Sequence, residues 1–221
     1  MNKALFWDFD GTLIYSISVW AKLLYTGFNN SDIDFEEMRP FFRKGYSWNF
    51  PEISYADQTG HKWWDKLFAH FSLYCESHNI SKEEAEKAFG YLKEQVVDPK
   101  NYTLYEDTVS TLRECINLGY KNYIISNNFP ELPLLIKNLG IADYFTDYIV
   151  SANVGYEKPR IEIFQHALKI AGYPDDCYMI GDNPVADIEG AEAAGMKTIL
   201  AHGVELSEIP AIIKGDKSYA F

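Results

Sequence analysis

Two carboxylates, Asp8 and Asp10, stand two residues apart directly after the apolar run Ala4-Leu5-Phe6-Trp7. Side chains at positions i and i+2 of a continuing strand point the same way, so both carboxylates would face one site. One carboxylate could attack phosphorus as a nucleophile while the other reached the leaving-group oxygen. The pattern predicts an aspartyl-phosphate on Asp8. Asp10 would be the general acid for the leaving alkoxide and then the base for the hydrolytic water.

Polar residues also follow three later apolar runs. The segments that carry them are Ser126-Asn127-Asn128, Gly155-Tyr156-Glu157-Lys158-Pro159 and Gly181-Asp182-Asn183-Pro184-Val185-Ala186-Asp187. In an open parallel sheet, ligands bind beyond the carboxyl ends of the strands. We therefore expect these segments to converge with Asp8 and Asp10 on one crevice.

The predicted crevice gathers four carboxylates, those of Asp8, Asp10, Asp182 and Asp187. Four such groups would repel one another and raise each other's pKa, but a hard divalent cation makes them compatible. Mg²⁺ takes oxygen ligands and keeps waters and substrate phosphate in its shell, so we predict Mg²⁺ as the cofactor. A phosphoryl group needs donors and cations for its three equatorial oxygens. The candidate substrate-binding residues of the crevice are Ser126, Asn127 and Lys158.

Five short apolar runs predict the strands that position these residues. They are Ala4 to Phe9, Tyr120 to Ile125, Tyr148 to Val150, Cys177 to Ile180 and Lys197 to Ala201. Their near-continuous hydrophobicity is typical of strands covered on both faces. Helical patterns lie between the later four, and each ends close to a glycine. Alternating strands and helices with short joins predict an α/β fold with a doubly wound parallel sheet.

The first predicted strand is separated from the others by a long helical insertion. Residues 16–96 show helical periodicity, and Ser81 with Glu84 matches a capping box. We therefore predict a core domain of residues 1–15 and 97–221 and a helical cap domain of residues 16–96. The basic and aromatic stretch RPFFRKGYSW lies in this insertion, and we expect its Arg43 to face the crevice and bind substrate.

The 221-residue chain has a formal net charge of -12 and three widely spaced cysteines without a CxxC motif. Its acidity disfavours nucleic acid and anionic membranes as partners. The sparse cysteines argue against a disulfide framework and a zinc site. Without a signal peptide or a membrane-spanning apolar run, we expect a cytoplasmic protein. A monomer is the default state, and a homodimer remains open.

The motifs DFDGT, Ser126, Lys158-Pro159 and GDNPVAD, in this order, resemble those of the haloacid dehalogenase superfamily of phosphohydrolases. The resemblance covers roughly residues 1–15 and 97–205, and the insertion resembles the α-helical cap of one class. It implies that Asp8 is the nucleophile, Asp10 the acid/base, Ser126 the phosphate donor and Lys158 the neutralising cation. It also implies that Asp182 binds Mg²⁺ with Asp8 and the backbone carbonyl of Asp10.

The resemblance implies that Asp187 binds a metal-bound water or orients Lys158. Three positions depart from the family's common pattern. Asn128 stands where glycine is frequent, Ala186 stands where asparagine is common, and Arg160 stands where an acidic residue is common. None of the three removes a catalytic position.

The favoured function is a Mg²⁺-dependent phosphomonoester hydrolase acting on a small phosphorylated metabolite. A phosphomutase or phosphotransferase would use the same aspartyl-phosphate. Haloacid dehalogenases of this fold lack the second aspartate of the first motif, so Asp10 argues against dehalogenation. A receiver-like signalling module would phosphorylate an aspartate after a later strand, without a helical insertion. A non-catalytic phospho-ligand-binding protein also remains open.

Overall fold

The structure, a computed structural model, describes residues 2–15, 19–28, 33–201 and 204–215 of the chain. Five parallel strands form one sheet in the order β3-β2-β1-β4-β5. Their bounds are Lys3–Trp7 (β1), Lys121–Ser126 (β2), Asp147–Val150 (β3), Asp176–Gly181 (β4) and Lys197–Leu200 (β5). The predicted α/β fold with a doubly wound parallel sheet is therefore confirmed, and each predicted strand overlaps an observed one.

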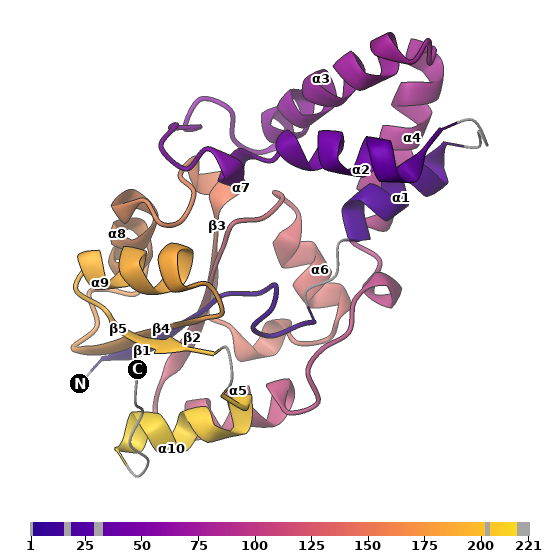
Figure 1. The fold of residues 1–221 in the computed structure, drawn as a ribbon. Helices are drawn as coiled ribbons and strands as arrows, with labels where there is room; N and C mark the ends of the chain where they lie inside the picture. The colour runs from indigo at the N-terminus through magenta and orange to yellow at the C-terminus, as the bar shows by residue number, and fades with distance from the viewer. Residues whose placement is uncertain (1, 16–18, 29–32, 202–203, 216–221) are drawn as a thin grey trace.

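Helices cover both faces of the sheet (Figure 1). They are α5 (Thr108–Asn117), α6 (Leu132–Asn138), α7 (Ser151–Val154), α8 (Ile161–Ile170), α9 (Gly190–Ala193) and α10 (Ile209–Lys214). Successive side chains of a strand point to opposite faces. Leu5 and Trp7 accordingly pack into the hydrophobic cluster that contains α5 and α10, while Phe6 packs into the cluster that contains α8 and α9. This two-sided burial explains why the strands read as continuous apolar runs.

The strand order creates a switch point beside β1. The chain adds β2 and β3 on one side of β1 and then returns to add β4 and β5 on the other side. Neighbouring loops diverge at such a reversal and leave a crevice at the carboxyl ends of the strands. The β1 and β4 strands end there side by side, and the backbone N–H of Asp8 donates to the carbonyl of Ile180 over 2.9 Å.

Between β1 and β2 the chain forms a helical insertion, which we define as α1 to α4. These helices span Val19–Gly27 (α1), Phe35–Lys44 (α2), His61–Ser77 (α3) and Lys82–Gln95 (α4). They pack on one another and stand over the carboxyl edge of the sheet (Figure 1). The predicted capping box is present, because Ser81 and Glu84 bond reciprocally at the start of α4.

Aromatic side chains join the insertion to the core. The Trp20 ring lies 5.2 Å from the ring of Phe129, which follows β2, and the Trp64 ring lies 6.0 Å from it. Trp20 also contacts Tyr46, Trp48 and both tryptophans at the start of α3. The apolar cluster of the insertion is therefore continuous with one face of the sheet. Within the described ranges, every helix is too short or too polar to cross a lipid bilayer.

Candidate active site

Asp8 and Lys158 form the buried centre of the site. Asp8 follows β1, and Lys158 lies in the loop between α7 and α8. The Lys158 Nζ donates to Asp8 Oδ1 over 2.8 Å, to Asp187 Oδ1 over 2.5 Å and to the Ile125 carbonyl over 3.0 Å. Burial alone would lower the pKa of the ammonium, but Asp187 and Asp8 outweigh that effect and raise it above its ordinary value. Lys158 therefore remains charged.

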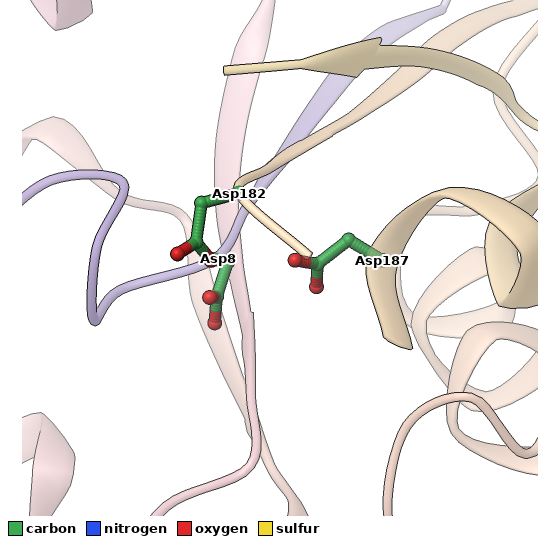
Figure 2. A group of neighbouring side chains, drawn as sticks. All are labelled: Asp8, Asp182 and Asp187. Carbon is green, nitrogen blue, oxygen red and sulfur yellow. The ribbon is translucent and has the colours of Figure 1, made fainter. Parts of the chain in front are cut away.

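Three carboxylates converge at this centre, and Figure 2 shows their side chains. Asp8, Asp182 and Asp187 each present an oxygen within 4.8 Å of the other two. Gly11 allows the approach: its φ is +81°, and a Cβ there would collide with the Asp182 carboxylate. Three carboxylates and one ammonium leave a formal charge of -2, which one divalent cation would balance. This set of hard oxygen donors fits Mg²⁺.

Asp187 interacts with the lysine more directly than the sequence indicated. It lies in a π-helical turn, η4 (Pro184–Glu189), where its Oδ1 accepts from Lys158 and its Oδ2 accepts from the backbone N–H of Asn183 over 3.0 Å. Burial raises the pKa of Asp187 to about 6, although the Lys158 ammonium opposes this. Because both of its oxygens are engaged, Asp187 is suited to orient Lys158.

Asp10 lies in a different environment from Asp8. Its Oδ2 accepts a hydrogen bond of 2.6 Å from the Nδ2 of Asn128. Burial, reinforced by the negative charge of Asp8, raises the pKa of the Asp10 carboxyl to about 7, while the Asn128 bond opposes that rise. A carboxyl with this pKa can hold or release a proton near neutral pH, as a general acid and base must.

Ser126 and Asn127 follow the same strand but play different structural parts. Ser126 is buried at the end of β2. Asn127 lies beside the lysine loop, where its Oδ1 accepts from the Lys158 backbone N–H over 2.7 Å and its Nδ2 donates to the Lys158 carbonyl over 3.0 Å. Its side chain thereby holds the backbone of Lys158 in place. A direct contact of Asn127 with substrate stays a prediction.

The comparisons with known proteins agree with this geometry. A family model described as a haloacid dehalogenase-like hydrolase matches residues 2–195. The chain belongs to the haloacid dehalogenase-like hydrolases. A glyceraldehyde 3-phosphate phosphatase from Methanothermobacter thermautotrophicus is 32% identical to this hydrolase over 94% of the chain and 88% of the relative.

Solved structures share the fold of this hydrolase. A HAD phosphatase from Thermococcus onnurineus has 25% identity and a TM-score of 0.66, over 96% of this chain and 98% of that chain. A 2-haloacid dehalogenase from Pseudomonas syringae pv. Tomato has 20% identity and a TM-score of 0.71, over 98% of this chain and 100% of that chain. The fold is thus common to both chemistries, and only the site residues can distinguish them.

Arg43 of this hydrolase lies apart from the other site residues that the sequence indicated. It is exposed near the end of α2 and lines a hollow of about 310 Å³ with Pro40, Lys44, Asn49 and Phe50. Among the described residues, its backbone carbonyl accepts hydrogen bonds from Asn49 and Tyr46 of the insertion. Its role in substrate binding stays a prediction.

Two residues of the hydrolase site were missed by the sequence reasoning. Asn128 bonds the Asp10 carboxylate, and its polar side chain at a position where glycine is frequent was the signal that could have found it. Glu157 is 1% exposed and accepts from the hydroxyl of Ser47, which in turn accepts from the Trp63 indole over 2.9 Å. This chain of bonds ties the residue before Lys158 to the insertion. No local pattern marks it.

Proposed function

We propose that the protein is a Mg²⁺-dependent phosphomonoester hydrolase that acts on a small phosphorylated metabolite through an aspartyl-phosphate intermediate. The observation that carries the proposal is the contrast between two neighbouring carboxylates. Asp8 is paired with the Lys158 ammonium, whereas Asp10 has a pKa raised to about 7. Two carboxylates whose environments differ in this way can take the roles of nucleophile and general acid.

In the first half-reaction, an oxygen of Asp8 forms a bond to phosphorus as the bond between phosphorus and the ester oxygen breaks. Asp10 transfers its proton to the departing alkoxide, so the alcohol leaves neutral. Lys158 pairs with Asp8 and faces the negative charge of the phosphoryl group. Ser126 and the backbone amides beside it donate to the phosphoryl oxygens.

In the second half-reaction, Asp10 accepts a proton from water, and the water oxygen attacks the phosphorus of the aspartyl-phosphate. The bond between phosphorus and Asp8 breaks, which regenerates the carboxylate and releases inorganic phosphate. One water is consumed for each ester cleaved. Each proton that Asp10 gives in the first half is recovered in the second half.

The residues that would hold Mg²⁺ are Asp8 and Asp182, with the backbone carbonyl of Asp10 as a further ligand and Asp187 through a bound water. When bound, the cation would supply positive charge to the phosphoryl oxygens. Asp187 orients Lys158 through the ion pair between them. The excess of three converging carboxylates over a single ammonium supports this assignment, because a divalent cation would balance the remaining charge.

The helical insertion is proposed to be a cap, spanning residues 16–96 between core segments 1–15 and 97–221. A cover over the catalytic edge excludes bulk water and favours small substrates over macromolecules. The name of the glyceraldehyde 3-phosphate phosphatase relative supports a small phosphorylated substrate.

The test measures both products from a panel of small phosphomonoesters, with Mg²⁺ and with EDTA. We expect metal-dependent release of inorganic phosphate and alcohol in equal amounts. Alcohol released in excess of phosphate would instead indicate phosphoryl transfer to another acceptor. No release from any ester by the folded protein would contradict the proposal, and chloride release from a 2-haloacid would then identify dehalogenation.

A further inference from the structure

Asn128 combines two properties that together set it apart from the other residues of the site. It is 3% exposed, and its side chain touches both Asp10 and Ser126. Its Nδ2 donates to Asp10 Oδ2 over 2.6 Å and to Ser126 Oγ over 3.3 Å. The amide therefore bridges the general acid and the phosphate donor of the proposed hydrolase. In the resemblance drawn from the sequence, glycine is frequent at this position and could make neither bond.

The orientation of the Asn128 amide is fixed by its own surroundings. Its Oδ1 accepts from the backbone N–H of Phe129 over 3.0 Å, so its Nδ2 must point toward Asp10. Its backbone N–H donates to Ser151 Oγ over 3.1 Å. Anchored at both the backbone and the side chain, Asn128 holds its donor in one direction. Among the described residues, it is the only side chain that donates a hydrogen bond to Asp10.

This bond also selects which oxygen of Asp10 works as the acid. An oxygen that accepts from the Asn128 amide acts as the carbonyl oxygen of the neutral carboxyl. The acid proton would then be carried by the other oxygen, Oδ1. The bond would thus leave one defined oxygen of Asp10 to protonate the leaving group, and the geometry of proton transfer would depend on it.

We propose that Asn128 is a positioning residue that holds Asp10 for protonation of the leaving group. This inference rests on the proposed phosphomonoester hydrolysis. Asn128 itself transfers no proton and forms no covalent bond. Its removal should therefore impair only those substrates whose leaving group needs a proton in the transition state.

The test compares phenyl phosphate with p-nitrophenyl phosphate, which are similar in shape but differ in the basicity of the leaving group. The p-nitrophenolate leaves with little need for a proton, whereas the phenolate depends on the acid. We expect Asn128→Ala to lower kcat/KM for phenyl phosphate by about 10- to 100-fold, and for p-nitrophenyl phosphate by less than about threefold. A residue needed only for folding would lower both values equally.

A second variant guards against misfolding of the alanine variant. Asn128→Leu keeps roughly the volume of the buried side chain but has no donor for Asp10. We expect the same selective loss. Asn153→Ala is the matched control. The exposed Asn153 of α7 donates to the carbonyl of Pro130 over 2.9 Å, and Pro130 lies in the same loop as Asn128. Its ratio of the two kcat/KM values should equal that of the wild type.

A double-mutant cycle with Asp10→Asn completes the test. If Asn128 acts through Asp10, then Asn128→Ala should change the ratio of the two kcat/KM values no further once Asp10 is replaced. An unchanged ratio in both Asn128 variants would overturn the inference. If the wild-type protein released phosphate from no ester of the panel, the failure would lie with the proposed function, and the inference would fall with it.

Discussion

The carboxyl edge of the sheet and the helical insertion each contain buried side chains, but different interactions stabilise them. At the edge, charges of opposite sign compensate one another: a single lysine pairs with Asp8 and Asp187. In the insertion, indole and phenyl rings pack around Trp20, and the indole N–H groups of Trp63 and Trp64 bond to Ser47 and Glu131. A polar edge needs particular residue types at particular strand ends, whereas apolar packing accepts many combinations.

Replacement of the nucleophile should have the largest effect, and it affects only the polar edge. Asp8→Asn should lower kcat by on the order of 10⁴-fold or more, because the amide cannot form the acyl phosphate. The thermal midpoint should stay close to that of the wild type. Steady-state phosphate release and circular dichroism measure the two quantities. Asp57→Asn, an exposed carboxylate of the insertion, is the control and should retain full activity. Near-normal turnover by Asp8→Asn would disprove the nucleophile assignment.

Removal of the central cation should destabilise the edge through its charges. Lys158→Met leaves two buried carboxylates without their partner and should lower the free energy of unfolding by about 4 kcal/mol. Urea denaturation measures the loss. Lys87→Met breaks the exposed pair with Glu83 and should cause no measurable loss of stability. Equal stability of the two variants would show that the buried pairs do not hold the edge.

Removal of a central ring should destabilise the insertion through its packing. Trp64 is 1% exposed and lies 5.0 Å from the Trp63 ring. Trp64→Ala should lower the free energy of unfolding by about 3 kcal/mol, because it leaves a cavity that the neighbours fill only partly. Urea denaturation applies here as well. Leu73→Ala is the matched control, since Leu73 is 58% exposed on the same helix. A loss as small as that of Leu73→Ala would contradict the packing argument.

The bond between Glu157 and the insertion should give a smaller effect that depends on pH. Burial raises the pKa of Glu157, while the bonds from Ser47 and Ser151 and the positive charges of Lys158 and Lys66 oppose the rise. The folded state therefore favours neutral Glu157, and this stabilisation is lost as pH rises through the folded-state pKa. The amide that replaces the carboxyl in the Glu157→Gln variant would not titrate, so the stability of this variant relative to wild type should rise as the pH increases from about 4 toward neutral. Unfolding free energies across that range measure the trend, and a constant difference would refute it.

The polar edge could largely be predicted from the sequence, because its chemistry resides in residue types at strand ends. The run Tyr120 to Ile125 predicts β2 (Lys121–Ser126) within one residue at each end. The structure brings Asp8, Lys158 and Asp187 into contact, as the strand pattern predicts. The order of the strands and the position of β1 at the centre followed only from the observed pairing.

The remaining features depend on contacts that no local pattern encodes. Asn128 and Asp10 are 118 residues apart in the chain, and Glu157 and Ser47 are 110 residues apart. The sequence predicts only a helical pattern between the last two strands, whereas the structure has a π-helical turn around Asp187. The basic stretch around Arg43 indicates charge but does not say which way the side chain points. Side-chain direction follows from how helices pack, and packing is a property of the whole fold.

The central place of β1 also has a consequence for how the protein acquires activity. This strand is made first, yet Leu5 pairs with Asn122 on one side and with Tyr178 on the other. Contacts so distant along the chain form slowly, because the intervening loops must close before pairing is rewarded. During synthesis, Asp8 can therefore contact Lys158, Asp182 and Asp187 only after most of the chain has been made. The rate at which activity recovers after dilution from denaturant should consequently report when all five strands have paired, and not when the strands on one side of β1 have paired.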